Sequence, residues 1–217
     1  MKIKAVMFDL DGTLLNTLED ITDSMNTVIE REGFQTHSTE AYKYFIGDGV
    51  EAMVRRALPS NQQEETMIAK LMKRYRAEYH KNWSNKTKPY DGITDLLEAL
   101  EEKGLRLAIL SNKPDEPTKL MVSHYFSNQK FDVVQGAKSD MPRKPDPKAA
   151  LEIASRLSIE TDQFFYLGDT ATDMKTAVAA GMYPVGVSWG FRTQEELRGN
   201  GAKLIIDKPT DLLRHFH

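Results

Sequence analysis

Four short segments of the chain carry residues that could bind a phosphate group and a metal ion. The first is Asp9-Leu10-Asp11-Gly12-Thr13, in which two carboxylates stand two positions apart at the end of an apolar run. If the strand geometry continues, both carboxylates project from the same face. Two like charges held together are costly unless a cation joins them or one is protonated. An Asp-Gly turn is the plain alternative, but the flanking of Leu10 by two carboxylates favours a cation site.

The second and third segments carry anion-binding groups. Ser111 and the amides that follow it come directly after an apolar run and could hold a phosphate at a loop or helix start; Ser111 or Asn112 could equally be a plain helix N-cap. Pro145 and Pro147 stiffen the loop around Lys144, whose ammonium would neutralise a phosphate as a point charge. Taken alone, Lys144 could also be an ordinary exposed lysine.

The fourth segment is Gly168-Asp169-Thr170 with Asp173, where an apolar run ends and a helix is expected. Asp173 falls on the same helix face as Asp169 because the two are four residues apart. Thr170 could simply cap the helix, and Asp173 could simply favour its N-terminal dipole. Since all four segments follow predicted strands, they together predict an anion site with a divalent cation.

The elements that must position these residues alternate between strand and helix. Near-continuous apolar runs are typical of strands buried on both faces of a parallel sheet. Such runs occur at residues 5–10, 105–111, 131–135, 164–168, 184–188 and 204–206. Alternation with helical segments predicts an α/β fold with right-handed crossovers, and ligands bind at the carboxyl ends of the strands in such folds.

Residues 15 to about 88 interrupt this alternation with helical signals and no clear strand. Asn16 followed by Glu19 resembles a capping box at the start of a helix that Gly33 closes. Further helices are predicted over about 50–58 and 62–79. We therefore expect a discontinuous sheet domain, residues 1–14 and 89–217, with an inserted helical domain over residues 15–88.

Composition excludes several classes of function. The chain has 217 residues, a formal charge of -3 and no cysteine. The charge offers no field for nucleic acid or an anionic membrane, and the lack of cysteine excludes disulfides, thiolate nucleophiles and cysteine-ligated metals. The apolar run before Asp9 is too short for a signal peptide or a membrane span. We therefore expect a cytoplasmic protein with no nucleic-acid or membrane partner.

On these four motifs the chain resembles the phosphatases of the haloacid dehalogenase superfamily, and within them the phosphoglycolate phosphatase type. Residues 89–92 resemble the return of the chain from cap to core, and residues 186–191 a segment common in that branch. The resemblance implies a Rossmann-like parallel sheet core with helices on both faces and an inserted all-helical cap domain.

The resemblance also implies a mechanism. Asp9, already ionised at neutral pH, would attack phosphorus and form an aspartyl-phosphate, while Asp11 would act as general acid and base. Mg²⁺ would be the cofactor. Its ligands would be Asp9, Asp169 and the backbone carbonyl of Asp11, with Asp173 in support. The phosphoryl oxygens would be held by Ser111, Asn112 and Lys144.

The residues that choose the substrate are expected in the cap. Gly47 lies in a loop that could face the active site, and Arg55 and Arg56 could meet a substrate carboxylate, although both arginines could be solvated helix residues. The expected partner is a small phosphorylated metabolite, and the protein a monomer or homodimer. Pyrophosphate, sugar phosphates and nucleoside monophosphates stay open as substrates beside phosphoglycolate.

Other functions are less favoured by these residues. A phosphotransferase similar to β-phosphoglucomutase would carry an acidic residue where this chain has Gly168. A phosphoaspartate signalling module has no reason to host a long helical insertion, and Asp11 argues against storing the intermediate. A non-catalytic binding protein would have no need of the complete set of motif residues.

Overall fold

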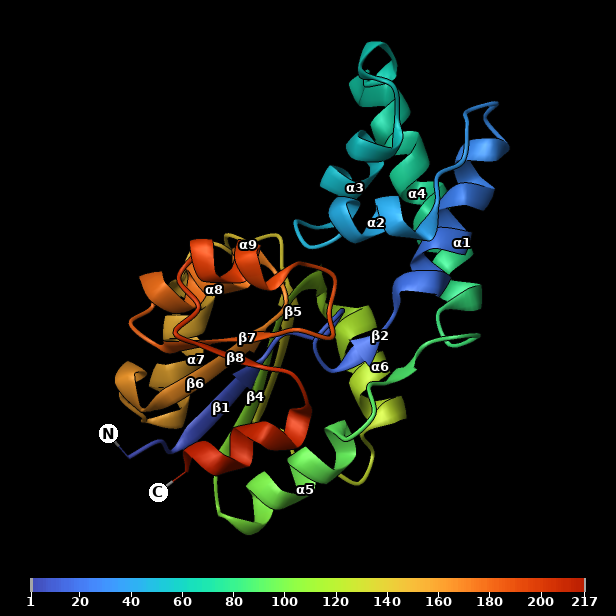
Figure 1. The fold of residues 1–217 in the computed structure, drawn as a ribbon. Helices are drawn as coiled ribbons and strands as arrows, with labels where there is room; N and C mark the ends of the chain where they lie inside the picture. Colours follow the sequence, from blue (N-terminus) through green and yellow to red (C-terminus); the bar gives the residue numbers. More distant parts are fainter. Residues whose placement is uncertain (1, 217) are drawn as a thin grey trace. The chain divides into compact units, whose positions relative to one another are not determined.

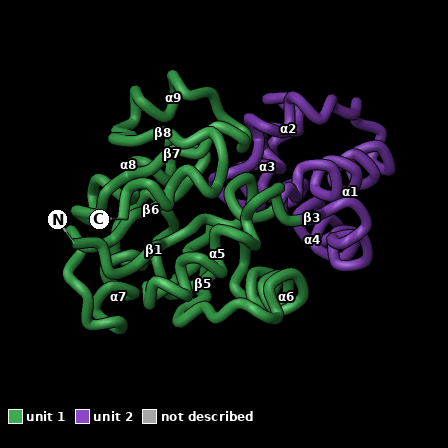
Figure 2. Tube along the Cα trace, turned by 60° about the horizontal axis from the view of Figure 1, so that its bottom comes forward, with its two compact units in different colours: residues 1–15, 89–217 green, residues 16–88 purple. Residues whose placement is uncertain are grey.

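The computed structural model describes residues 2–216 (Figure 1). The chain divides into two compact units (Figure 2). The first, here called the sheet unit, comprises residues 1–15 and 89–217, and the second, the helical unit, comprises residues 16–88. All residues of the four motifs belong to the sheet unit.

The sheet unit is built on parallel strands. Within residues 2–216 its sheet has six strands in the order β5-β4-β1-β6-β7-β8. Their bounds are β1 Ala5–Phe8, β4 Arg106–Pro114, β5 Val133–Ala137, β6 Phe164–Gly168, β7 Tyr183–Val187 and β8 Leu204–Ile206. Each predicted apolar run overlaps one of these strands, although β4, β5 and β7 extend beyond the predicted bounds. The predicted parallel α/β fold is confirmed.

Helices cover both faces of the sheet (Figure 1). Their bounds are α5 Ile93–Glu102, α6 Asp115–Tyr125, α7 Lys148–Leu157, α8 Ala171–Ala179 and α9 Gln194–Gly199, with 3-10 turns η2 Thr161–Gln163 and η3 Pro209–His215. Alternate residues of the central strand β1 face opposite sides. Ala5 and Met7 belong to a core cluster with α7 and α8, and Val6 and Phe8 are fully buried on the other face. This double coverage explains why the strands are continuously apolar.

Strand β4 runs further than the sequence indicated. It continues through Ser111 and Asn112 to Pro114, which pairs with Ala137 of β5 after an irregularity beyond Leu110. Helix α6 then begins at Asp115. The alternative of Ser111 or Asn112 as a helix N-cap is therefore wrong, because both residues lie within β4 and Pro114 is the residue at the N-cap of α6.

The helical unit contains α1 Leu18–Glu30, α2 Thr39–Phe45, α3 Val50–Ala57 and α4 Glu65–Asn82, with a 3-10 turn η1 Ser60–Gln62. The seven-residue α2 was not predicted; it is too short to show a clear periodicity, and Ser38 caps it through the N–H of Ala41. None of the helices in residues 2–216 combines the length and the apolar character needed to span a bilayer.

The expected capping box at Asn16 is wrong. Asn16 belongs to the two-residue strand β2 (Leu15–Asn16), which pairs with β3 (Lys88–Pro89). Helix α1 follows Thr17, whose side chain makes no capping hydrogen bond. Extended pairing of Asn16 therefore takes precedence over a local cap.

A buried carboxylate ties the last residues of the helical unit to α1. Asp20 is 2% exposed and accepts hydrogen bonds from the N–H of Lys86 at 3.0 Å and from the N–H and Oγ1 of Thr87, both at 2.8 Å. Because a charged acceptor satisfies buried donors strongly, this side chain fixes the return of the chain toward the sheet unit.

We expect Asp20→Ala to lower the free energy of unfolding by about 2–4 kcal/mol, because it leaves the buried donors of Thr87 without an acceptor. Asp23→Ala is the matched control on the same helix, since Asp23 is exposed and pairs only at the surface with Lys86. Urea denaturation of both variants checks this. Equal effects of the two substitutions would contradict the role given to Asp20.

Candidate active site

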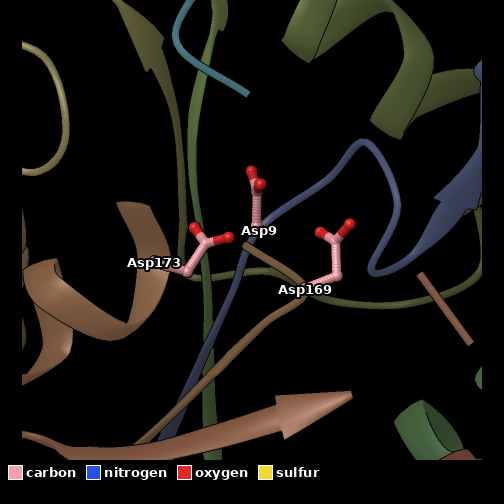
Figure 3. A group of neighbouring side chains, drawn as sticks. All are labelled: Asp9, Asp169 and Asp173. Carbon is pink, nitrogen blue, oxygen red and sulfur yellow. The ribbon is translucent and has the colours of Figure 1, made fainter. Parts of the chain in front are cut away.

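Three buried carboxylates meet at the carboxyl ends of two neighbouring strands. Asp9 follows β1, Asp169 follows β6, and Asp173 lies in the first turn of α8 (Figure 3). One oxygen from each lies within 4.8 Å of the others, and Figure 3 shows all three carboxylates directed to the same side. The sheet order places β1 next to β6, so the fold itself brings these residues together.

The ammonium of Lys144 lies among these carboxylates. Its Nζ is 3.0 Å from Oδ1 of Asp9 and 2.7 Å from Oδ1 of Asp173, and it donates to the carbonyl of Leu110 at 3.0 Å. Burial opposes its charge, but the carboxylates of Asp173 and Asp9 outweigh burial and hold the pKa of Lys144 well above its usual value. Lys144 is therefore a buried cation and not the exposed lysine that its sequence context alone would allow.

Asn112 positions Lys144 through its side chain. Its Nδ2 donates to the carbonyl of Lys144 at 3.0 Å, and its Oδ1 accepts the N–H of Lys144 at 2.9 Å. Such a paired amide contact fixes the backbone from which Lys144 projects. Nothing in the sequence marked this role, because the contact joins strand β4 to a loop 32 positions further along the chain. Ser111, 3% exposed, accepts the N–H of Lys113 at 3.2 Å.

Asp169 is held on both oxygens. Oδ1 accepts from Oγ1 of Thr13 at 3.0 Å, and Oδ2 accepts from the N–H of Phe191 at 2.8 Å. Gly12 and Gly190 pack against it so closely that a Cβ at either position would lie within about 2.2 Å of an Asp169 atom. Residues 12–13 and 190–191 therefore form a cradle for this carboxylate.

Burial raises the pKa of Asp169 well above its usual value, and the negative charges of Asp173 and Asp9 raise it further. The hydrogen bonds from Phe191 and Thr13 act in the opposite direction. The ionised form of Asp169 therefore needs a nearby positive charge, which the surrounding side chains supply only in part.

Asp173 serves a cap and an ion pair at once. Its Oδ2 accepts from the N–H and the Oγ1 of Thr170, while Thr170 Oγ1 accepts the N–H of Asp173, which completes a capping box. Its other oxygen contacts Lys144. Both oxygens of Asp173 thus have partners in the protein. The capping role that the sequence allowed accounts for only one of the two oxygens.

Asp11 pairs with a residue that sequence reasoning did not single out. Lys113 Nζ donates to both oxygens of Asp11, at 3.1 and 3.2 Å. Lys113 lies in the stretch of β4 beyond Asn112. The missed signal was its place two residues after Ser111, which puts it on the same face of an extended strand.

The donor set fits a divalent cation. The pKa of Asp9 is raised to about 7, chiefly by burial. The negative charges of Asp173 and Asp11 also raise this pKa, whereas the positive charge of Lys144 lowers it. Three clustered carboxylates face one ammonium, and hard cations such as Mg²⁺ prefer oxygen ligands. A cation beside Asp9 and Asp169 would favour the ionised form of both, so the buried acid cluster could hold a metal ion.

The residues expected to choose the substrate lie in the helical unit: Gly47, Arg55 and Arg56. Arg55 pairs with Glu51 at 2.9 Å and with Glu65 at 2.8 Å. Arg56 pairs with Asp48 and donates to two backbone carbonyls of the same unit. Contacts inside the helical unit thus engage both arginines, which favours the structural interpretation of these two residues.

A family model described as haloacid dehalogenase-like hydrolase matches residues 6–187. The chain belongs to this family. Among proteins similar to this chain, the phosphoglycolate phosphatase of Rhodospirillum rubrum is 32% identical, over 94% of this chain and 87% of that protein. The phosphoglycolate phosphatase of Aquifex aeolicus is 28% identical, over 98% and 96%.

Solved structures of this family agree. A Lactobacillus delbrueckii subsp. bulgaricus protein, provisionally assigned as a phosphoglycolate phosphatase, superposes with a TM-score of 0.94 at 32% identity, covering 100% of this chain and 99% of that one. The chain is therefore a haloacid dehalogenase-type phosphatase similar to phosphoglycolate phosphatases.

We expect Mg²⁺ to stabilise the protein more at pH 8 than at pH 5.5. With a folded-state pKa of about 7 against the usual 3.8, Asp9 binds its proton more tightly when folded. The metal-free protein therefore loses stability as the pH rises from about 4 through 7. A cation that binds the ionised site restores that loss, whereas at pH 5.5 it competes with the proton.

Thermal melts with EDTA or Mg²⁺ measure this effect. At about a hundred times its Kd, Mg²⁺ should raise the Tm at pH 8 by about 5–10 °C. Asp9→Asn is the control and should reduce the pH dependence, and what remains is due to Asp169, whose pKa burial also raises. An equal Mg²⁺ effect on the Tm at both pH values would contradict the placement of a metal site at Asp9 and Asp169.

Proposed function

We propose that the chain is a Mg²⁺-dependent phosphatase that hydrolyses phosphoglycolate through an aspartyl-phosphate on Asp9. The observation that carries this proposal is the position of Asp9, whose carboxylate lies against the Lys144 ammonium and beside the cradled carboxylate of Asp169. A nucleophile placed between a fixed cation and a metal-binding acid can approach an anionic phosphate.

The reaction divides into two displacements at phosphorus. A carboxylate oxygen of Asp9 attacks phosphorus and the bond to the ester oxygen breaks. Asp11, protonated once Lys113 no longer contacts its carboxylate, gives its proton to the leaving oxygen. Water then attacks the same phosphorus, its proton passes to Asp11, and the bond to Asp9 breaks. Inorganic phosphate leaves, and both aspartates return to their initial states.

The remaining groups compensate charge and orient the phosphoryl group. Lys144 neutralises the phosphoryl oxygens, and Ser111 donates its hydroxyl to one of them. Mg²⁺, held by Asp9, Asp169 and the carbonyl of Asp11, would supply further positive charge to the transferring group. Asp173 keeps Lys144 in place through its ion pair.

The helical unit acts as the cap that selects the substrate. Phosphoglycolate is proposed because relatives that cover nearly the whole chain carry that activity in their names. A mutase-type arrangement is disfavoured, since a side chain in place of Gly168 would lie 2.2 Å from Cβ of Asp173.

Phosphate release tests the function. Phosphoglycolate, pyrophosphate, a sugar phosphate and a nucleoside monophosphate are compared with and without EDTA, and phosphoglycolate should give the highest kcat/KM. EDTA or Asp9→Asn should abolish turnover, and Asp11→Asn should lower kcat by about 10²–10⁴-fold.

Asp162→Asn, an exposed substitution in η2, serves as the control and should leave turnover unchanged. Turnover that survives EDTA or Asp9→Asn would refute the mechanism. A higher kcat/KM for another substrate in the set would refute the choice of phosphoglycolate.

A further inference from the structure

Lys113 forms an ion pair with Asp11, the residue to which the proposed function gives contact with the leaving oxygen. Nζ of Lys113 is nearly equidistant from the two oxygens of Asp11. The side chains are 6% and 12% exposed, respectively. A largely buried ammonium that meets both oxygens of a carboxylate is already arranged to bind that kind of group.

The backbone that carries Lys113 is held from several directions. Its carbonyl accepts from Oγ1 of Thr118 at 3.3 Å, and its N–H donates to Ser111. The neighbouring strand approaches so closely that a Cβ on Gly136 would lie 2.6 Å from the Lys113 carbonyl oxygen. Asp115 accepts the N–H of Gly136 at 2.9 Å. Lys113 is therefore fixed in place and is not a mobile surface lysine.

We propose that Lys113 binds the carboxylate of the substrate and thereby selects phosphate esters whose leaving oxygen sits on the carbon next to a carboxylate. This inference rests on the proposed function, in which Asp11 contacts the leaving oxygen. In such an ester the carboxylate is attached to the carbon that bears that oxygen. A cation in contact with Asp11 is thus within reach of the substrate carboxylate.

The exchange is chemically conservative. The substrate carboxylate takes over contact with Nζ that Asp11 makes in the structure, so the ammonium keeps an anionic partner. Sugar phosphates and pyrophosphate offer no carboxylate at this position. Such substrates would gain no carboxylate contact with Lys113 on binding, which gives a physical reason for preferring a two-carbon acid phosphate.

Kinetics with a matched pair of substrates test the proposal. Phosphoglycolate is compared with 2-hydroxyethyl phosphate, in which a hydroxymethyl group replaces the carboxylate. Lys113→Met should lower the ratio of the two kcat/KM values by about 30-fold or more, chiefly through KM for phosphoglycolate. Lys113→Arg, which keeps the charge, should restore much of the ratio. Lys138→Met, an exposed lysine just beyond β5, should leave the ratio unchanged.

An equal loss of kcat/KM on both substrates in Lys113→Met would overturn the proposal, because it would show that Lys113 acts only on Asp11. A thermal melt identifies a variant that fails to fold, and in that case Lys113→Gln, which removes the charge but keeps a polar side chain, takes the place of Lys113→Met: a lowered ratio supports the proposal and an unchanged ratio overturns it.

A binding measurement separates this inference from the proposed function. In Asp9→Asn protein with Mg²⁺, calorimetry gives the Kd of both ligands with and without Lys113→Met. Weaker binding of phosphoglycolate alone supports the carboxylate site, even if the unmodified chain releases no phosphate and the proposed function fails. A Kd ratio that does not respond to Lys113→Met overturns the inference, whatever the activity.

Discussion

The buried ammonium of Lys144 is the interaction on which the rest of the site depends. Removing an ion from water costs several kcal/mol unless partners compensate it, and here Asp9 and Asp173 compensate it at 3.0 and 2.7 Å. The same contact keeps two like charges from repelling each other across the edge of the sheet. Asn112 and Thr170 then act indirectly, the first by holding the backbone of Lys144 and the second by orienting Asp173.

Much of the fold was predictable because strands that are buried on both faces of a sheet appear in the sequence as continuous apolar runs. Each strand of the main sheet overlaps a predicted apolar run, and the predicted site residues that follow β1 and β6 lie together in the structure. What the sequence did not reveal depends on contacts between distant segments. The Asn112 side chain recognises a backbone far along the chain, and the extension of β4 that carries Lys113 exists because β5 pairs with it.

The two points where the chain passes between the units lie next to each other in the structure. Residues 15–16 and 88–89, where the chain passes between the units, pair with each other as β2 and β3. An insertion whose entry and exit lie side by side need not separate the strands of its host. Asp20 anchors the exit from within the helical unit, while the chemical groups of the site all come from the sheet unit.

The central position of β1 has a consequence for how the protein is made. Ala5 pairs with Arg106 on one side and with Phe164 on the other, and both partners follow the whole helical unit in the chain. The nascent chain must therefore carry β1 without a partner strand while the whole helical unit is synthesised, and with one side unpaired until β6 follows. Such distant pairings slow folding and prolong exposure of an aggregation-prone edge. The protein should therefore depend on chaperones during synthesis more than a helical bundle of equal length.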